Sequence, residues 1–171
     1  IAAKVDAQGK FLWITTAISS AVFKDKNLKY VFRPQPHSDQ FGEVSVDMVA
    51  QESKAAYGMN ADKLKVAIIY EDGPYGAGVA AGNEATAKKH RMNIVLKEGY
   101  AATAPDLSSL IIKLKRAKPD VIFHTGYNPD ITLFFRQARE QGLKWKALLG
   151  HGAGHSQIDK LRETFKNDVD Y

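Results

Sequence analysis

Two histidines four positions apart, His151 and His155, stand among glycines in the stretch LGHGAGHS. On a helix this spacing would turn both rings to one side, where they could share a zinc ion. Gly150, Gly152 and Gly154 make a helix unfavourable here, and the chain has no cysteine and no HExxH motif to add ligands. We therefore expect a loop without a metal, whose histidines either line a binding pocket or are uninvolved.

Two further loops carry a tyrosine directly after an apolar run. The run KVAIIY is followed by EDGPYG, and the run DVIFH is followed by TGYN. If these runs are parallel strands, the loops lie at the edge of the sheet where ligands bind. A tyrosine there offers a flat face and a hydroxyl, although each could instead be a half-buried loop anchor. The helix N-termini that follow favour anions. The candidate ligand-binding residues are Tyr75, Tyr127, His151, Asp72 and Gly126.

An enzyme is the main alternative. The stretch GAGVAAG, residues 76–82, with Glu98 at the end of the next strand, resembles a dinucleotide-binding pattern. The first glycine of that pattern should follow the strand almost at once, yet residues 71–75 intervene. Asp72 with His124 or His151 could form an acid–base pair, but no activated nucleophile accompanies them. The sequence also has neither a phosphate-loop lysine motif nor GxSxG. We expect no enzymatic activity and no cofactor.

Composition argues against several other classes. The 171 residues carry 24 basic and 19 acidic side chains, a net charge of +5. The densest basic clusters, residues 88–91 and 113–116, fall late in helical patterns, where cations suit the helix dipole, so nucleic-acid binding is not expected. The absence of cysteine excludes disulfides and cysteine catalysis. No apolar stretch reaches the roughly 20 residues that span a bilayer, and no signal peptide opens the chain.

From residue 63 onward, apolar runs alternate with helical patterns. Residues 65–70, 93–97, 120–124 and 146–149 have the composition of buried parallel strands. Helices are expected over about 75–91, over a stripe from Leu107 to Ala117 capped by Asp106, and from an Asn128 cap to Gly142. This alternation predicts an α/β fold in which an open parallel sheet carries helices on both faces.

The first sixty residues are organised differently. Phe11–Ile18 resembles a buried strand, Tyr30–Pro36 a short strand broken by two prolines, and Asp39–Tyr57 a helix. The prolines make Arg33–Pro36 the expected crossover between two bodies. Residues 1–32 are too few to close a domain, so we expect a piece of a longer protein. A strand at residues 11–18 without neighbours would favour self-association, or leave the first thirty or so residues disordered or swapped.

The order and spacing of these segments resemble a known family. The stretches VAIIYEDGPYGAGVAAGNEATAKK, LSSLIIKLKRAKPDVIFHTGYNPDITLFFRQAREQGLK and LLGHGAG are similar to periplasmic solute-binding proteins of ABC importers, and more narrowly to the leucine/isoleucine/valine-binding group. YVFRPQPHSDQFG resembles the crossover to the second lobe of that family. The resemblance implies a type I periplasmic-binding fold with residues 1–33 ending the first lobe, 34–36 forming the hinge crossover and 37–171 forming the second lobe.

The resemblance also implies a function and roles for residues. It implies capture of a small molecule between the lobes in the periplasm and delivery to an ABC permease, or a ligand-sensing receptor of the same fold. Tyr75 matches a cleft tyrosine of the family, and Tyr127 matches the tyrosine of its GGY motif. His151 stands where amino-acid binders commonly carry a glutamate that pairs with the α-ammonium group, and the segment that grips the carboxylate lies upstream. His155 has no family role and is expected to face solvent or cap a helix.

The histidine at position 151 bears on the ligand class. Without the glutamate, a buried amine would be costly, whereas histidine suits a carboxylate through a hydrogen bond or a positive charge. Tyr75 and Tyr127 add surfaces for ring stacking. We expect a small organic acid, with an aromatic carboxylate favoured. A branched-chain amino acid whose ammonium is held by Asp72 or by backbone carbonyls is the alternative.

Overall fold

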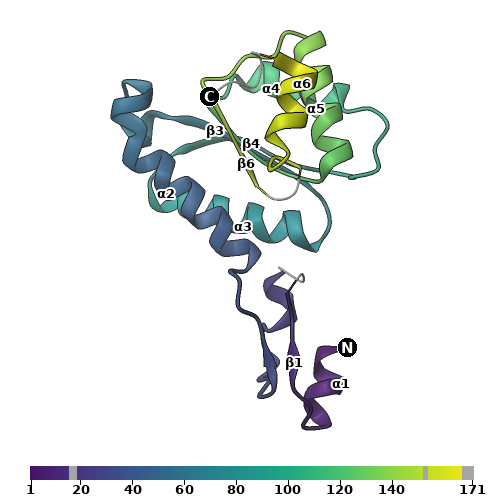
Figure 1. The fold of residues 1–171 in the computed structure, drawn as a ribbon. Coiled ribbons are helices and arrows are strands. Elements are labelled where there is room, and N and C mark those ends of the chain that lie inside the picture. The colour runs from purple at the N-terminus through teal and green to yellow at the C-terminus, as the bar shows by residue number, and fades with distance from the viewer. Residues whose placement is uncertain (16–18, 152–153, 167–171) are drawn as a thin grey trace.

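The computed structural model describes residues 1–15, 19–151 and 154–166. Helices and strands alternate along the chain from β3 onward (Figure 1). In chain order the elements are α1 (Ala2–Ala7), β1 (Leu12–Trp13), η1 (Ser20–Val22), β2 (Val31–Phe32), α2 (Ser38–Tyr57), η2 (Ala61–Lys63), β3 (Lys65–Glu71), α3 (Pro74–Lys89), β4 (Asn93–Tyr100), α4 (Ser108–Ala117), β5 (Val121–Thr125), α5 (Asn128–Glu140), β6 (Ala147–His151) and α6 (Ile158–Phe165).

A four-stranded parallel sheet forms the centre of the larger part of the molecule. Its strand order is β4-β3-β5-β6, so β3 and β5 are central and β6 is an edge strand. The four apolar runs predicted to be strands are these strands, each of which ends one to three residues later than expected. The expected open parallel sheet is confirmed.

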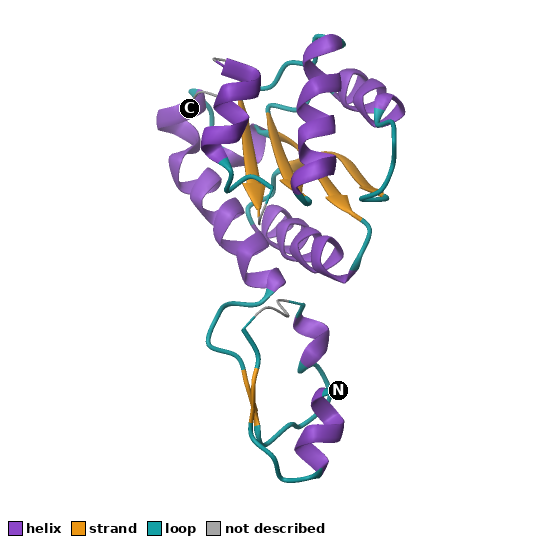
Figure 2. Ribbon diagram, turned by 45° about the vertical axis from the view of Figure 1, so that its right-hand side comes forward, coloured by secondary structure: helices purple, strands orange, loops and turns teal. Residues whose placement is uncertain are grey.

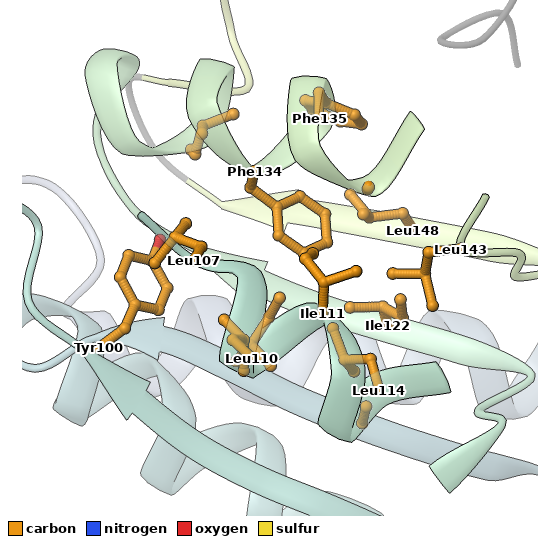
Figure 3. Close-up of a cluster of buried hydrophobic side chains, with 14 of the residues drawn as sticks. Tyr100, Leu107, Leu110, Ile111, Leu114, Ile122, Phe134, Phe135, Leu143 and Leu148 are labelled. Carbon is orange, nitrogen blue, oxygen red and sulfur yellow. The ribbon is translucent and has the colours of Figure 1, made fainter. Parts of the chain in front are cut away.

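Helices cover both faces of this sheet (Figure 2). Alternation along β3 sends Ala67 and Ile69 into a core shared with α4, α5 and α6, while Val66 and Ile68 enter a second core shared with α2 and α3. Figure 3 shows the first of these cores, with Tyr100 at one end of it. Burial on both faces explains why the strands are continuous apolar runs rather than alternating ones.

The helix starts differ from the predictions by about one residue. The Asp106 carboxylate accepts the Ser108 N–H at 3.2 Å, but α4 begins at Ser108 with Leu107 in the capping position. Tyr127 rather than Asn128 is the capping residue of α5, and Asn128 is already helical. Shifts of this size are common because helix ends fray and caps compete.

The first 36 residues form a small separate part at the N-terminal end of α2 (Figures 1 and 2). β1 and β2 pair in parallel over two residues each. The expectation of a buried strand from Phe11 to Ile18 is wrong for its described part, because Phe11 is 66% and Trp13 56% exposed. Residues 16–18 lie outside the described residues. The apolar side chains of this strand have too little neighbouring structure to cover them.

Candidate functional site

Tyr75 and Tyr127 lie side by side at the carboxyl edge of the sheet. Tyr75 is in the first turn of α3, after β3, and Tyr127 caps α5, after β5. Because β3 and β5 are neighbouring parallel strands, these two turns meet, and the ring centroids are 6.0 Å apart with an interplanar angle of 47°. Tyr127 is 44% exposed and Tyr75 is half-buried. The pair therefore presents an aromatic surface at the edge where ligands bind in this class of fold.

Both tyrosines keep their hydroxyl protons at neutral pH. Burial, followed by the influence of Tyr127 and of the Glu71 carboxylate, raises the pKa of Tyr75 to about 12. Burial, followed by the charges of Glu71 and Asp130, raises the pKa of Tyr127. The carboxylates of Glu71 and Asp130 place negative charge near the tyrosine pair, which disfavours an anion there. The tyrosines therefore offer apolar ring faces and hydrogen-bond donors.

Buried Glu71 caps the N-terminus of α3. Its carboxylate accepts the Gly73 N–H at 2.7 Å and the Gly76 N–H at 2.5 Å. A Cβ added at Gly76 would lie 2.1 Å from the Glu71 backbone oxygen, so the turn needs a glycine there. The expectation that this helix N-terminus favours an external anion is wrong, because the protein's own carboxylate already fills that role.

The other glycines of GAGVAAG serve the packing of α2 on α3. A Cβ at Gly78 would lie 2.2 Å from a serine hydroxyl at the start of α2, and one at Gly82 would lie 2.1 Å from the Asp39 backbone oxygen. Glu98, the expected ribose-binding acid of the enzyme alternative, pairs with Lys113 at 2.7 Å. The glycine-rich turn is thus filled by protein groups, and its residues do not fit a dinucleotide.

The N-terminus of α5 carries a second buried carboxylate. Asp130 Oδ1 accepts the Tyr127 N–H at 2.9 Å, and Asp130 Oδ2 accepts the Tyr100 hydroxyl proton at 2.7 Å. A Cβ at Gly126 would lie 2.3 Å from Asp130 Oδ2. Gly126 is therefore required for this close packing. Asp72, the remaining candidate on these two loops, is exposed at the end of β3, and its N–H donates to the Tyr100 carbonyl at 2.9 Å.

His151 ends β6 and is 7% exposed. Its Nδ1 lies 3.3 Å from the Thr125 hydroxyl, the register partner on β5. Burial lowers the pKa of His151 to about 4, although the backbone groups of His124 and Phe41 oppose that shift. The ring is neutral at physiological pH, so of the two roles considered for it, a hydrogen bond is compatible with the structure and a positive charge is not.

His151 faces a groove along the edge of β6. The groove has a volume of about 1040 Å³. Its walls come from both faces of β6 and from the neighbouring helices α2, α5 and α6, and the side chains that line it include Phe41, Met48, Trp145, Leu149, His151 and Ile158. Neither tyrosine of the pair lines it. The structure thus joins Tyr75 to Tyr127 but places His151 in a different hollow.

His155 is buried rather than solvent-facing, which corrects the expectation for this residue. Its ring lies 5.1 Å from the His124 ring and 5.9 Å from the Phe135 ring, between centroids. A Cβ at Gly150 would lie 1.9 Å from His155 Cγ, so the ring packs directly on the β6 backbone. Burial, followed by the influence of His151, lowers the pKa of His155 to about 3.

Sequence reasoning did not identify the set of buried polar residues beneath the site. These residues are Glu71, Tyr100, His124 and Asp130, of which only His124 was considered, as a member of an acid–base pair. Asp130 had a readable signal, since an acid at the third helical position is typical of a capping box. Tyr100 and His124 had none, because their partners lie 24 or more positions away in the sequence.

Neither a metal site nor a membrane-spanning helix is found within the described ranges. Among residues 1–15, 19–151 and 154–166, no group of three or more histidine, aspartate or glutamate side chains is arranged to hold a metal ion. In the same part of the chain, no helix combines the length and apolarity that crossing a membrane requires. Gly152 and Ala153 of the histidine loop lie outside the described residues.

Comparisons with known proteins agree with this architecture. The sequence profile described as periplasmic binding protein matches residues 1–168. A Leu/Ile/Val-binding protein homolog 7 of Brucella abortus is 38% identical over 132 residues, which is 77% of this chain and 33% of that protein. The chain thus spans about a third of the length of the curated relatives it matches.

Solved structures show the same fold. A solute binding protein of an ABC transporter from Rhodopseudomonas palustris BisB5, solved with 3,4-dihydroxy benzoic acid, superposes with a TM-score of 0.72 at 20% identity, over 98% of this chain and 43% of that one. A substrate-binding protein from Desulfitobacterium hafniense, solved with Leu, gives a TM-score of 0.69 at 20% identity, over 98% of this chain and 53% of that one.

Proposed function

The chain belongs to the periplasmic binding protein family, whose members are non-enzymatic binding proteins, and we propose that it supplies the second lobe of a solute-binding protein that serves an ABC importer. In this proposal residues 1–33 end the first lobe, 34–36 cross the hinge and 37–171 form the second lobe. The solute is captured in the periplasm and delivered to a membrane permease. Ligand favours the closed state because only there do both lobes contact it.

The observation that carries the proposal is the pairing of Tyr75 with Tyr127. Their rings come from separate loops yet lie 6.0 Å apart, and Tyr127 remains 44% exposed although the strand that precedes it, β5, is buried along its whole length. An exposed aromatic pair at the carboxyl edge of a parallel sheet is suited to stack against a ligand ring, at roughly 0.5–1.5 kcal/mol per ring pair.

The ligand class that we favour is a small organic acid, in particular an aromatic carboxylate. The fold accommodates such ligands, since one chain of this fold was solved with 3,4-dihydroxy benzoic acid. Glu71 and Asp130 supply negative charge beside the tyrosines, which disfavours a carboxylate at that point. The ring of the ligand therefore lies against Tyr75 and Tyr127, and its carboxylate points to the opposite lobe.

His151 and Gly126 keep secondary roles in this proposal. His151 is neutral, and its Nε2 has no hydrogen-bond partner among the described residues, so in this proposal it is free to hydrogen-bond a polar group of the ligand. Gly126 holds the turn of Tyr127 close to the sheet, and Asp72 lies at the rim of the same edge.

An amino-acid ligand is the second candidate. The curated relatives carry Leu/Ile/Val-binding names, and one chain of this fold was solved with Leu. The negative charges beside the tyrosine pair would suit an ammonium group, and Asp72 is an exposed carboxylate on the same loop as Tyr75. A ligand-sensing receptor with the same fold would bind either class, and would differ in the partner rather than in the cleft.

Isothermal calorimetry on the complete protein decides between the two ligand classes. Benzoate and a hydroxycinnamate are expected to bind tightly, and leucine weakly. Tight leucine binding with no heat from either aromatic acid would contradict the aromatic-acid proposal and favour the second candidate. Saturable binding of NADH would instead favour a dinucleotide-binding enzyme and contradict the solute-binding proposal.

Two variants test the residues. Tyr127→Ala should weaken benzoate binding about fivefold to tenfold, or about 1–1.4 kcal/mol, while Tyr30→Ala is the matched control, because Tyr30 is equally exposed but belongs to the N-terminal part. His151→Glu should weaken benzoate binding about tenfold, since it replaces a neutral hydrogen-bonding ring of the cleft with a negative charge. Equal effects of Tyr127→Ala and Tyr30→Ala on benzoate binding would show that the tyrosine pair is not part of the binding site.

A further inference from the structure

A continuous chain of hydrogen bonds runs beneath the turn that carries Tyr127. His124 Nε2 lies 2.8 Å from the Tyr100 hydroxyl oxygen, the same hydroxyl lies 2.7 Å from Asp130 Oδ2, and Asp130 Oδ1 accepts the Tyr127 N–H at 2.9 Å. His124 comes from β5, Tyr100 from β4 and Asp130 from α5. Three elements are therefore tied together at the backbone of one exposed aromatic residue.

The order of protons along this chain follows from the chemistry of its members. A carboxylate only accepts hydrogen bonds, so the Tyr100 O–H donates to Asp130, and the Tyr100 oxygen must accept from His124. His124 is fully buried, and burial, followed by the charges of His155 and His151, lowers the pKa of His124 well below its usual value. The ring is therefore neutral with its proton on Nε2, and Nδ1 has no hydrogen-bond partner among the described residues.

The packing around the turn leaves it little freedom. A Cβ at Gly126 would lie 2.6 Å from the Tyr100 hydroxyl oxygen. On the other side, a Cβ at Gly154 would lie 2.7 Å from the Tyr127 carbonyl oxygen. The backbone of Tyr127 is thus enclosed between the hydrogen-bonded chain and the histidine loop, while its ring projects to the surface beside Tyr75.

We propose that His124, Tyr100 and Asp130 are positioning residues that hold Tyr127 in its orientation before ligand binds. Their hydrogen bonds order the turn in the free protein, so the ligand does not bear the entropic cost of ordering it. These three side chains are buried and do not contact the ligand in this proposal. The part of this inference that concerns affinity rests on the proposed function, whereas the ordering of the turn does not.

Tyr100→Phe tests the ordering without any ligand. The variant removes one hydroxyl, so Asp130 loses a donor and His124 loses its acceptor. Amide hydrogen exchange at Tyr127, corrected for global stability with the slowest sheet amides, is expected to become at least fivefold faster. Tyr70→Phe is the matched control, since Tyr70 lies on β3 and packs over Gly99 on the other side of the sheet. Unchanged exchange at Tyr127 in Tyr100→Phe would overturn the proposal.

Asp130→Asn gives a spectroscopic signature that a purely structural role would not produce. To keep the Tyr127 N–H bond, the new amide must place its oxygen there and its NH₂ group toward Tyr100. Tyr100 then has to donate to His124, which moves the imidazole proton from Nε2 to Nδ1. Nitrogen-15 NMR of the ring should report the Nε2–H form in the unsubstituted chain and the Nδ1–H form in Asp130→Asn. An Nε2–H ring in both proteins would contradict the proton order.

Benzoate calorimetry on the complete protein then links ordering to affinity. Tyr100→Phe is expected to weaken benzoate binding at least threefold, and Tyr70→Phe to leave it unchanged. Faster exchange with unchanged affinity would overturn the positioning role. If neither benzoate nor leucine binds the unsubstituted protein, the proposed function fails, and the exchange and NMR results still decide whether the chain orders the turn.

Discussion

The N-terminal 36 residues and the larger part that follows them, called the body below, both contain apolar runs. Only the runs of the body are buried. The run FLWI leaves Phe11 and Trp13 largely exposed, whereas the run VIFH buries Ile122 and Phe123 completely. β1 and β2 form a two-stranded sheet, but β5 has a neighbour on each side and helices over both faces. An apolar run therefore predicts a strand that needs covering, and the number of neighbouring elements decides whether it is covered.

The exposed aromatic side chains of the N-terminal part pack on one another instead. Phe11 stacks on Phe32 with 4.8 Å between ring centroids and on Trp13 with 6.5 Å. Isolated two-stranded sheets are marginally stable in water, so this part contributes little independent stability. The body, with its two cores, should account for nearly all of the cooperative unfolding.

The largest expected effect comes from truncating one phenylalanine in each region. Phe123→Ala removes a fully buried ring and should lower the free energy of unfolding by about 3–5 kcal/mol. Phe32→Ala removes a ring that is 42% exposed and should lower it by less than about 1 kcal/mol. Urea unfolding followed by circular dichroism measures both, and comparable losses would show that the N-terminal part shares the cooperative core.

Acid should destabilise the body through its buried histidines. Above pH 6.5 these side chains are neutral in both states. Below that pH the unfolded chain takes up protons that folded His151 does not bind until about pH 4, so stability falls as the pH falls. Between pH 7 and 5, the loss is about 2 kcal/mol for His151. His155 and His124 shift in the same direction.

Urea unfolding at pH 7 and pH 5 measures this loss. His151→Gln should show a smaller difference between the two pH values than the unsubstituted chain. The N-terminal 36 residues contain no histidine, so their local amide exchange should follow only the ordinary pH dependence of exchange chemistry. Equal unfolding midpoints at both pH values would mean that the histidines titrate normally in the folded state.

Substitutions among the exposed aromatic residues of the N-terminal part, such as Phe11, are expected to have the smallest effect on stability. They should nevertheless change self-association measurably. Sedimentation velocity should show weak self-association of the chain, because Phe11 and Trp13 offer an uncovered apolar surface. Phe11→Ser should weaken the association at least fivefold. Ile112→Ser, which removes a 44% exposed side chain from α4, should leave it unchanged. A monomer at all concentrations would contradict the expectation.

Much of the fold was readable from local patterns. The alternation of buried strands and amphipathic helices predicted the parallel sheet, and the parallel direction of the strands then brings the loops that follow them to one edge. That is why Tyr75 and Tyr127 could be assigned to a common edge before their distance was known. The strand ends and helix caps were less predictable, since Asp106 and Asn128 each compete with a neighbouring residue for the capping position.

The sequence by itself thus determined the parallel strands, their alternation with helices along the chain and the two tyrosine-bearing loops, because hydrophobic periodicity is a local property. Only the tertiary structure decided the electrostatics of the site. Glu71 neutralises the helix N-terminus that was expected to bind an anion, and burial leaves His151 uncharged. Tyr100 reaches Asp130 across 30 positions of sequence. Burial and such partners depend on residues that are distant along the chain, so no local pattern contains them.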